Sequence, residues 1–455
     1  MSLADSKTRQ RVGFTLLALF AVLLILAAIR LIPYVDLVSA RHSAVEAGLP
    51  QSLAEFYAND TAPRTENRLH KYDEIQEGPQ FGPKYLEVVM YGTHAPPVTP
   101  GNTELVLTQD QADLLFAGSN YFADYRFEAW TVRGQPIFRF DPHPPHSIHE
   151  LDGPIELHTF LADDASRVTV ISATWQLYSN APDLASKFIC DAWVPILDPP
   201  DDPYFMSILS RHYDRAGILR VMEYIANHPA TTAADLTIMI DAISDPAADV
   251  DLSAAIAGEH ATFAEVFRAG SFKNSNPLYN YAPPTPSQLV TGSYQRDQAM
   301  LIDALATLYQ AAETQPINEF ADRMEAIVDE AEASGLPISS DVLPAFLRFF
   351  RHTQWYQAQR NAALVALTYK RNLLVATSAL VRGRTPIPIE TLASLALPKP
   401  IDPYDGEPMR VVLRDNHIIV YSVGPDGIDN DALPEPGRSG NSTPGTDITF
   451  TVRLD

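Results

Sequence analysis

The longest uninterrupted apolar run of the chain lies near its N-terminus. Residues 12–29 read VGFTLLALFAVLLILAAI and contain no charged side chain. A helix of that length spans about 27 Å at about 1.5 Å per residue, close to the thickness of a bilayer core. Lys7, Arg9 and Arg11 precede the run, and such a basic flank stays in the cytoplasm. The pattern predicts a cytoplasmic N-terminus over residues 1–11 and a transmembrane helix over residues 12–33. A cleaved signal peptide is the alternative, although its apolar core is normally shorter.

The middle of the chain changes its periodicity twice. Residues 34–80 read as a helix followed by a polar linker. Residues 81–180 contain short runs rich in β-branched and aromatic side chains, separated by turn residues, which predict a β-rich domain. Those runs are residues 85–92, 103–107, 125–132, 136–140, 154–161 and 167–178. Residues 181–350 repeat apolar side chains at helical spacing and predict a helical domain. The helices expected there and just beyond are residues 205–225, 235–243, 261–267, 299–312, 318–333 and 355–381.

The last hundred residues predict a helix followed by a small β module, over residues 351–455. Prolines after Thr385 end the helical pattern, and two apolar runs follow at residues 409–414 and 417–423. Asp415-Asn416 between them is typical of a tight hairpin turn, and residues 447–454 read as a last strand. The predicted fold class is α+β: one N-terminal transmembrane helix, a β-rich domain, a helical domain and a small C-terminal α/β-hairpin module with an acidic loop.

The net charge and the cysteine content exclude some partners and some kinds of site. The 455 residues carry a formal net charge of −23, so a nucleic-acid partner is excluded for want of a basic field. The single cysteine, Cys190, excludes an internal disulfide and a multi-cysteine metal site. It sits among apolar residues and is expected to be a core side chain.

The N-terminal sequence resembles the prepilin signal of type IV pilins and type II secretion pseudopilins. Residues 11–17 read RVGFTLL, and the family signal places basic residues before a Gly and then Phe-Thr-Leu. The resemblance implies peptidase cleavage after Gly13, which would leave Phe14 as the new N-terminus. Ala18 departs from the family, where a Glu is usual at that position. That departure favours a tip or accessory role over a bulk filament subunit, and a chance match in an ordinary anchor remains the alternative.

The C-terminal sequence resembles the C-terminal module of the major pseudopilins of type II secretion. Residues 402–408 read DPYDGEP, residues 420–431 read VYSVGPDGIDND, and residues 446–448 read TDI. In that family a helix leads to an Asp-Pro-aromatic turn, two strands and a Tyr-Ser-x-Gly-x-Asp-Gly loop that binds calcium. The resemblance covers about 70 residues here, while the middle of the chain has no counterpart.

Carried over position by position, the resemblance implies four calcium ligands: Asp426, Asp429, Asp431 and Asp447. Ser422 and Asn430 are weaker candidates. Calcium takes six to eight oxygen ligands from carboxylates, amides and backbone carbonyls, which an acidic Gly-containing loop can supply. The loop does not follow the EF-hand pattern. A solvated acidic loop without an ion is the open alternative.

The chain contains one cluster of histidines that could bind a metal ion. Residues 141–150 read DPHPPHSIHE and place His143, His146 and His149 within one proline-rich segment. Imidazole suits zinc, but the spacing matches no known zinc motif, and a surface loop is the simpler interpretation. We therefore expect a non-enzymatic bacterial envelope protein. The alternative is a membrane-anchored exterior metal-dependent hydrolase.

The expected location follows from the predicted span and its flanks. The protein would be a single-pass inner-membrane protein with its N-terminus in the cytoplasm and its body periplasmic. Its partners would be membrane lipid, through the N-terminal helix, and other envelope or secretion proteins. Calcium would be its cofactor, and its role would be association, as a pseudopilin-like component of a type II secretion-like system.

Overall fold

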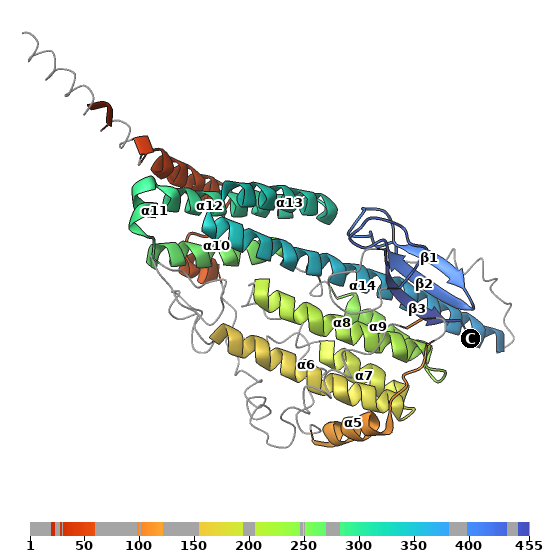
Figure 1. The fold of residues 1–455 in the computed structure, drawn as a ribbon. Helices are drawn as coiled ribbons and strands as arrows, with labels where there is room; N and C mark the ends of the chain where they lie inside the picture. The colour runs from red at the N-terminus through yellow and green to blue at the C-terminus, as the bar shows by residue number, and fades with distance from the viewer. Residues whose placement is uncertain are drawn as a thin grey trace, which may run out of the picture.

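The computed structural model shows a predominantly helical protein (Figure 1). It describes residues 20–22, 28–29, 31–59, 98–99, 102–121, 154–193, 205–245, 249, 251–269, 283–381, 398–434 and 445–454. Within this part, helices account for 71% and strands for 8%, and the three strands form one antiparallel sheet in the order β1-β2-β3. The predicted α+β fold with a β-rich domain is therefore wrong.

The elements follow one another along the chain as helices first and strands last. Residues 31–46 form the first long helix. The remaining elements are α2 (Leu53–Phe56), η1 (Tyr57–Asn59), α5 (Gln109–Tyr121), α6 (Pro154–Tyr178), α7 (Pro182–Trp193), α8 (Phe205–Asn227), α9 (Ala233–Ile243), α10 (Leu252–Ala269), α11 (Pro286–Thr291), α12 (Ser293–Thr314), α13 (Ile317–Ser334), α14 (Pro337–Val381), β1 (Arg410–Arg414), β2 (His417–Ser422) and β3 (Ile448–Arg453). Helices thus occur at each of the segments for which helical periodicity was recognised, with α14 starting well before residue 355.

Two large apolar clusters form most of the core, and α14 enters both. The first joins the helix of residues 31–46 to α2, α10, α12, α13 and the beginning of α14, where Phe346 and Phe350 are buried. The second joins α6, α7, α8 and α9 to the later part of α14 and to the sheet, with Tyr356 and Leu367 in its interior. Figure 1 shows α14 running between the two groups of helices toward the sheet.

A carboxylate from a neighbouring helix fixes the start of α14. Asp297 of α12 is 2% exposed. Its oxygens accept hydrogen bonds from the backbone N–H groups of Ile338 and Ser339, each at 2.8 Å. A further bond of 2.7 Å comes from the hydroxyl of Ser339. The first N–H groups of a helix have no partner within it and carry partial positive charge, so a buried anion there is stabilising.

The strands expected between residues 154 and 178 are instead one helix. The segments 154–161 and 167–178 both lie in α6, which has 25 residues. Every residue from 168 to 174 of α6 is buried, so the segment has no polar face whose spacing would have distinguished a helix from a strand. β-branched residues favour strands only weakly, and packing against α7 and α8 overrides that preference.

The other expected strands of that region do not support a sheet either. Residues 103–107 are described and form no strand. The segments 85–92, 125–132 and 136–140 lie outside the described residues.

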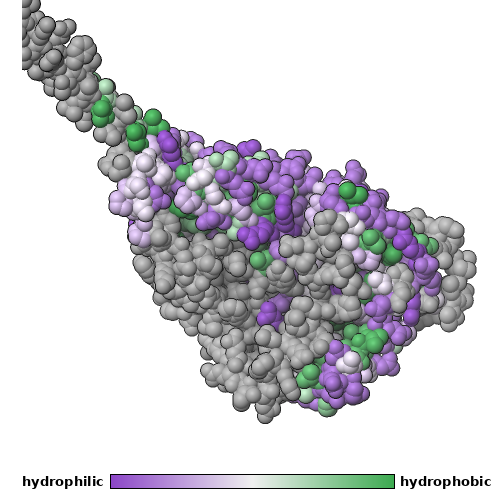
Figure 2. All heavy atoms as spheres, in the orientation of Figure 1, coloured by the Kyte–Doolittle hydropathy of each residue, from purple (hydrophilic) through white to green (hydrophobic). Residues whose placement is uncertain are grey.

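No helix among the described residues is both long and apolar enough to cross a membrane. This contradicts the predicted transmembrane helix and the single-pass inner-membrane location derived from it. Only a few residues of the predicted span are described, namely 20–22, 28–29 and 31–33. The helix that follows is amphipathic rather than uniformly apolar. It buries Leu37, Ala40 and Ala44 in the first core cluster, while Val35 and Val38 are about half exposed. Figure 2 shows hydrophobic side chains on the surface where this helix begins.

Side chains of α8 close one edge of the sheet. The carboxylate of Glu223 accepts a 2.6 Å hydrogen bond from the backbone N–H of Thr451. Asn227, one turn later, accepts from the N–H of Arg453 and donates to the carbonyl of Thr451, both at 2.7 Å. Glu223 and Asn227 are almost fully buried. They satisfy the outward-facing groups of β3 as another strand would.

We predict that Glu223→Ala lowers the free energy of unfolding by about 2–3 kcal/mol, because it leaves the buried N–H of Thr451 without a partner. Chemical denaturation monitored by circular dichroism measures the change. The matched control is Glu325→Ala, which removes an ion pair with Arg351 whose side chains are 52% and 51% exposed. That control costs at most about 1 kcal/mol. Equal effects of the two substitutions would contradict the edge-closing role of Glu223.

Candidate functional site

The C-terminal module forms the hairpin that the sequence predicts. β1 and β2 pair in antiparallel fashion from Arg410↔Tyr421 to Arg414↔His417. The two turn residues, Asp415 and Asn416, have φ values of 48° and 63°, as expected for a two-residue turn that follows the twist of the strands. β3 pairs with β2 on the other side, so the predicted strands of this module are confirmed.

Asp402 ties the turn of residues 402–408 to the sheet. Its carboxylate accepts hydrogen bonds from the backbone N–H of Tyr404 (3.0 Å), the hydroxyl of Ser422 (2.7 Å) and the N–H of Val423 (3.0 Å). Asp402 is completely buried. Burial raises the pKa of this carboxyl, and the three hydrogen bonds act in the opposite direction. The Asp of the Asp-Pro-aromatic motif therefore has a structural role, which the sequence analysis did not assign.

Three of the four proposed calcium ligands gather around Asn430. The carboxylate of Asp447 accepts from the N–H of Asn430 at 3.3 Å. Asp426 accepts from the N–H of Gly445 at 2.7 Å, and its carboxylate also interacts with the side chain of Asn430. Asp429 lies near enough to Asp447 for their charges to repel, which contributes to a raised pKa at Asp447. The loop thus brings Asp426, Asp429 and Asp447 into one neighbourhood.

Asp431 is not part of this group. Its side chain is 83% exposed and pairs with Arg414 at 2.9 Å. Asp429 is also engaged, because it accepts from the hydroxyl of Tyr421 at 3.1 Å. Burial and the neighbouring Asp429 raise the pKa of Tyr421 to about 12. Ser422, a weaker candidate, donates to Asp402, which leaves Asp426 and Asp447 as the better ligand candidates.

Among the described residues of the loop, Asp447 has a buried polar atom without a hydrogen-bond partner. The residue is fully buried, and its Oδ2 has no hydrogen-bond partner. Burial, above all, raises the pKa of this carboxyl. A buried carboxylate oxygen without a partner is costly, and a cation would remove that cost.

The donor set around Asp447 fits calcium only if backbone and amide oxygens contribute. Across the described residues, no three His, Cys, Asp or Glu side chains lie close enough together to hold a metal ion. A site here would therefore combine the carboxylates of Asp447 and Asp426 with the side chain of Asn430 and loop carbonyls. Such oxygen-rich, mixed donor sets suit calcium rather than zinc.

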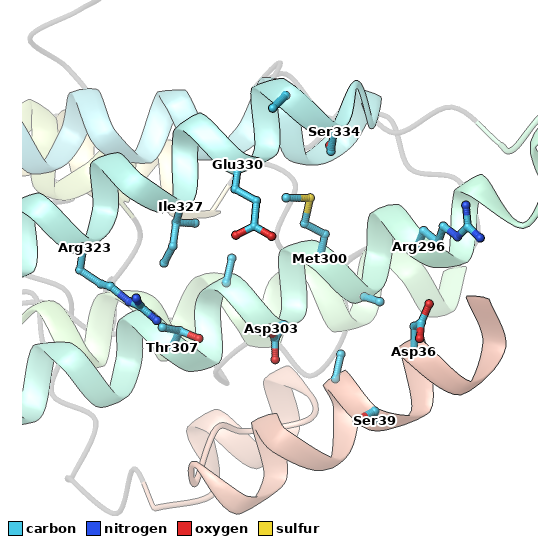
Figure 3. Close-up of a pocket in the computed structure, with 14 residues that line it drawn as sticks. Asp36, Ser39, Arg296, Met300, Asp303, Thr307, Arg323, Ile327, Glu330 and Ser334 are labelled. Atoms are coloured by element: carbon cyan, nitrogen blue, oxygen red, sulfur yellow. The ribbon is translucent and has the colours of Figure 1, made fainter. Parts of the chain in front are cut away.

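A second candidate is an open groove between the helix of residues 31–46, α12 and α13 (Figure 3). Its volume is about 680 Å³. Figure 3 shows Glu330 and Asp303 on opposite walls, with Arg323 and Arg296 toward the two ends. Alanines and Met300 lie between these charges. The mixed charges are exposed and do not converge on one point, so the groove does not specify a ligand chemistry.

A third candidate is a buried histidine between α8 and α14. His212 is 1% exposed and stacks between Tyr356 and Phe349, with ring centroids 4.8 Å and 6.1 Å away. Neither ring nitrogen has a hydrogen-bond partner. Burial lowers the pKa of His212 well below 6.5, and the charges of Arg215 and Arg211 add to the effect. Burial, aromatic stacking and a lowered pKa together describe a neutral histidine packed in the core.

The other residues that the sequence singled out are either buried in the core or outside the described part of the chain. Cys190 is buried in the second core cluster, as expected. Gly13 and Phe14, the expected cleavage site, lie outside the described residues. So do His143, His146 and His149, the basis of the hydrolase alternative.

We predict that Asp402→Ala lowers the free energy of unfolding by about 3 kcal/mol, because it leaves the N–H groups of Tyr404 and Val423 unpaired. Denaturant titration of the full chain measures this. Asp405→Ala is the control, since Asp405 pairs with Arg410 at a half-buried site and its loss costs about 1 kcal/mol. A cost for Asp402→Ala no larger than that of the control would show that the motif is not held by Asp402.

We predict that the protein loses stability as the pH falls below about 6.5, in part through His212. The folded state keeps this side chain neutral, whereas the unfolded chain takes up a proton near pH 6.5, so acid favours unfolding. His212→Phe preserves the stacking and reduces the slope of unfolding free energy against pH by at most about 1.4 kcal/mol per pH unit. Denaturation between pH 5 and 8 measures it. An unchanged slope in His212→Phe contradicts the prediction.

Comparisons with known proteins leave the geometry as the basis for any functional conclusion. No family model matches the chain. No curated protein and no solved structure matches it either.

Proposed function

We propose that this is a non-enzymatic protein that acts through protein–protein association and whose C-terminal module is stabilised by calcium. The module consists of β1, β2, β3, the turn of residues 402–408 and the acidic loop that begins after β2. Its sequence resembles that of the major pseudopilins, and the proposal includes a role as a pseudopilin-like component of a type II secretion-like system.

One observation carries the calcium part of the proposal: the buried, unpartnered Oδ2 of Asp447. Removing a carboxylate from water costs several kcal/mol unless a partner compensates for it. The N–H of Asn430 bonds to Oδ1, and the N–H of Ala432 and the side chain of Asn430 also stabilise the carboxylate, but Oδ2 itself has no hydrogen-bond partner. A calcium ion at Oδ2 would complete the pairing and would also screen the repulsion between Asp447 and Asp429.

The chemistry of the loop favours calcium over magnesium. Calcium accepts six to eight oxygens in flexible geometry, whereas magnesium requires a nearly ideal octahedron and keeps several waters. Asp426, Asn430 and Asp447 come from different parts of the loop, and Gly424 and Gly427 have φ values of 70° and 63°. Such a loop offers irregularly placed oxygens, which suit the larger ion.

The proposal of a non-enzymatic role rests on the hydrogen bonds and ion pairs that the polar side chains of the module make. Asp402, Ser422 and Tyr421 bond to the module itself, and Asp405 pairs with Arg410. These contacts stabilise a surface rather than present a reactive group, which favours association as the role of the module.

The test is thermal unfolding of the full chain with 2 mM calcium chloride, with 2 mM magnesium chloride and with a chelator. We expect calcium to raise the Tm by several degrees and magnesium to raise it much less, because an ion that binds only the folded state stabilises it by mass action. Asp447→Asn removes the calcium response. It also raises the Tm in the chelator, because it removes a buried charge.

Asp431→Asn is the matched control. It lies in the same loop and removes the same charge, but Asp431 faces solvent beside Arg414, so the calcium response persists. A Tm that is identical with calcium and with chelator in the unsubstituted protein would overturn the calcium proposal.

A further inference from the structure

The two edges of the small sheet differ in whether their outward-facing backbone groups have hydrogen-bond partners. The outer edge of β3 is closed by Glu223 and Asn227 of α8. The outer edge of β1 faces away from α8 (Figure 1). Among the described residues, the backbone groups of Val411 and Leu413 form no hydrogen bond outside the β1–β2 pair. Within the part of the chain that the structure describes, β1 is therefore an open edge strand.

The register identifies which groups of β1 point outward. In a hairpin with a two-residue turn, the residues that flank the turn form a hydrogen-bonded pair, here Arg414↔His417. Hydrogen-bonded and non-hydrogen-bonded pairs then alternate along the ladder. Val411 and Leu413 thus direct their N–H and C=O groups away from β2. Their side chains are 50% and 63% exposed, so unpaired backbone and exposed apolar surface coincide at two residues.

The charges around β1 select the chemistry of what could pair with it. Residues 402–431 contain seven carboxylates and two arginines. Both arginines are already paired, Arg410 with Asp405 and Arg414 with Asp431. Glu407 and Asp415, which flank the strand, are exposed. The surplus negative charge favours a cationic partner.

The arginines of β1 disfavour the one self-pairing register that matches both outward-facing residues of two copies with each other. Antiparallel self-pairing that matches Val411 with Leu413 of another copy is centred on Val412. It places Arg410 of each chain opposite Arg414 of the other. Like charges directly opposite one another destabilise a strand pair.

We propose that the edge of β1 receives an extended, basic segment of a partner protein by strand addition. The backbone of the segment bonds to Val411 and Leu413, its apolar side chains pack beside theirs, and its Lys or Arg side chains face Glu407 and Asp415. The inference rests on the association role proposed above and identifies the surface that carries it. It does not depend on calcium.

The experiment uses the full chain and two synthetic peptides, Lys-Val-Lys-Val-Lys-Val-Lys and its counterpart with Glu in place of Lys. Binding is measured by fluorescence anisotropy, and protection of backbone amides by hydrogen exchange. We expect the Lys peptide to bind at least tenfold more tightly than the Glu peptide, and the amides of Val411 and Leu413 to become protected. Failure of the Lys peptide to bind, or protection elsewhere in the chain, overturns the proposal.

Val411→Pro is the diagnostic variant. It removes one outward N–H without touching the β1–β2 ladder, since proline is tolerated on edge strands where the N–H faces solvent. We expect at least tenfold weaker binding with an unchanged Tm. Should this variant unfold, Val411→Ser/Leu413→Ser provides the second test by removing the apolar contact alone. Unchanged affinity in the folded variants overturns the proposal.

Two further measurements distinguish strand addition by a partner from self-association of this chain and from the calcium proposal. Sedimentation that shows a dimer in the unsubstituted protein and a monomer in Val411→Pro would assign the edge to a second copy and overturn the peptide proposal. Asp447→Asn tests the calcium site without altering β1, so we expect it to bind the Lys peptide as tightly as the unsubstituted protein does. A Tm of the unsubstituted protein that does not respond to calcium, together with retained binding of the Lys peptide, would refute only the calcium proposal.

Discussion

The fold depends on one long helix that has to be buried along its length. α14 has 45 residues and therefore extends about 68 Å. A helix of this size is stable in a protein only when neighbouring elements cover its apolar side chains. α13 and α12 cover its beginning, and α8, α9 and the sheet cover the rest. Asp297 fixes its start by accepting from two N–H groups of its first turn.

The C-terminal sheet depends on that helix in turn. A three-stranded sheet needs an apolar face packed on another element to be stable, and Ile418, Val420 and Phe450 supply that face in the second core cluster. Polar side chains of the helical body then bond directly to the backbone of the module. Gln354 donates to the carbonyl of Pro403 at 3.1 Å, and Lys370 donates to the carbonyl of Arg453. The module is thus an integral part of one structure with α8 and α14.

The acidic residues of the module fall into groups with different physical roles. Asp402 is buried and saturated with donors, so it organises the turn. Asp431 is exposed and paired with an arginine, so it contributes little beyond local charge. Asp447 is buried and incompletely paired, which makes it the one position of the four candidates where a cation has a clear energetic reason to bind. Sequence alone treats these carboxylates as equivalent, because burial and partners come only with the fold.

The sequence by itself determined the elements whose signal is local. Helical spacing identified α8, α9, α10, α12 and α13, and the Asp415-Asn416 turn identified the β1–β2 hairpin, because these patterns depend on near neighbours in the chain. The tertiary structure alone decided that residues 154–178 form α6, since residues 168–174 within it are all buried and carry no periodic signal. It alone showed how residues 31–46 pack on the core, and it alone separated Asp447 from Asp431. Each of these outcomes depends on contacts between residues distant in sequence, and those contacts set burial, pairing and charge.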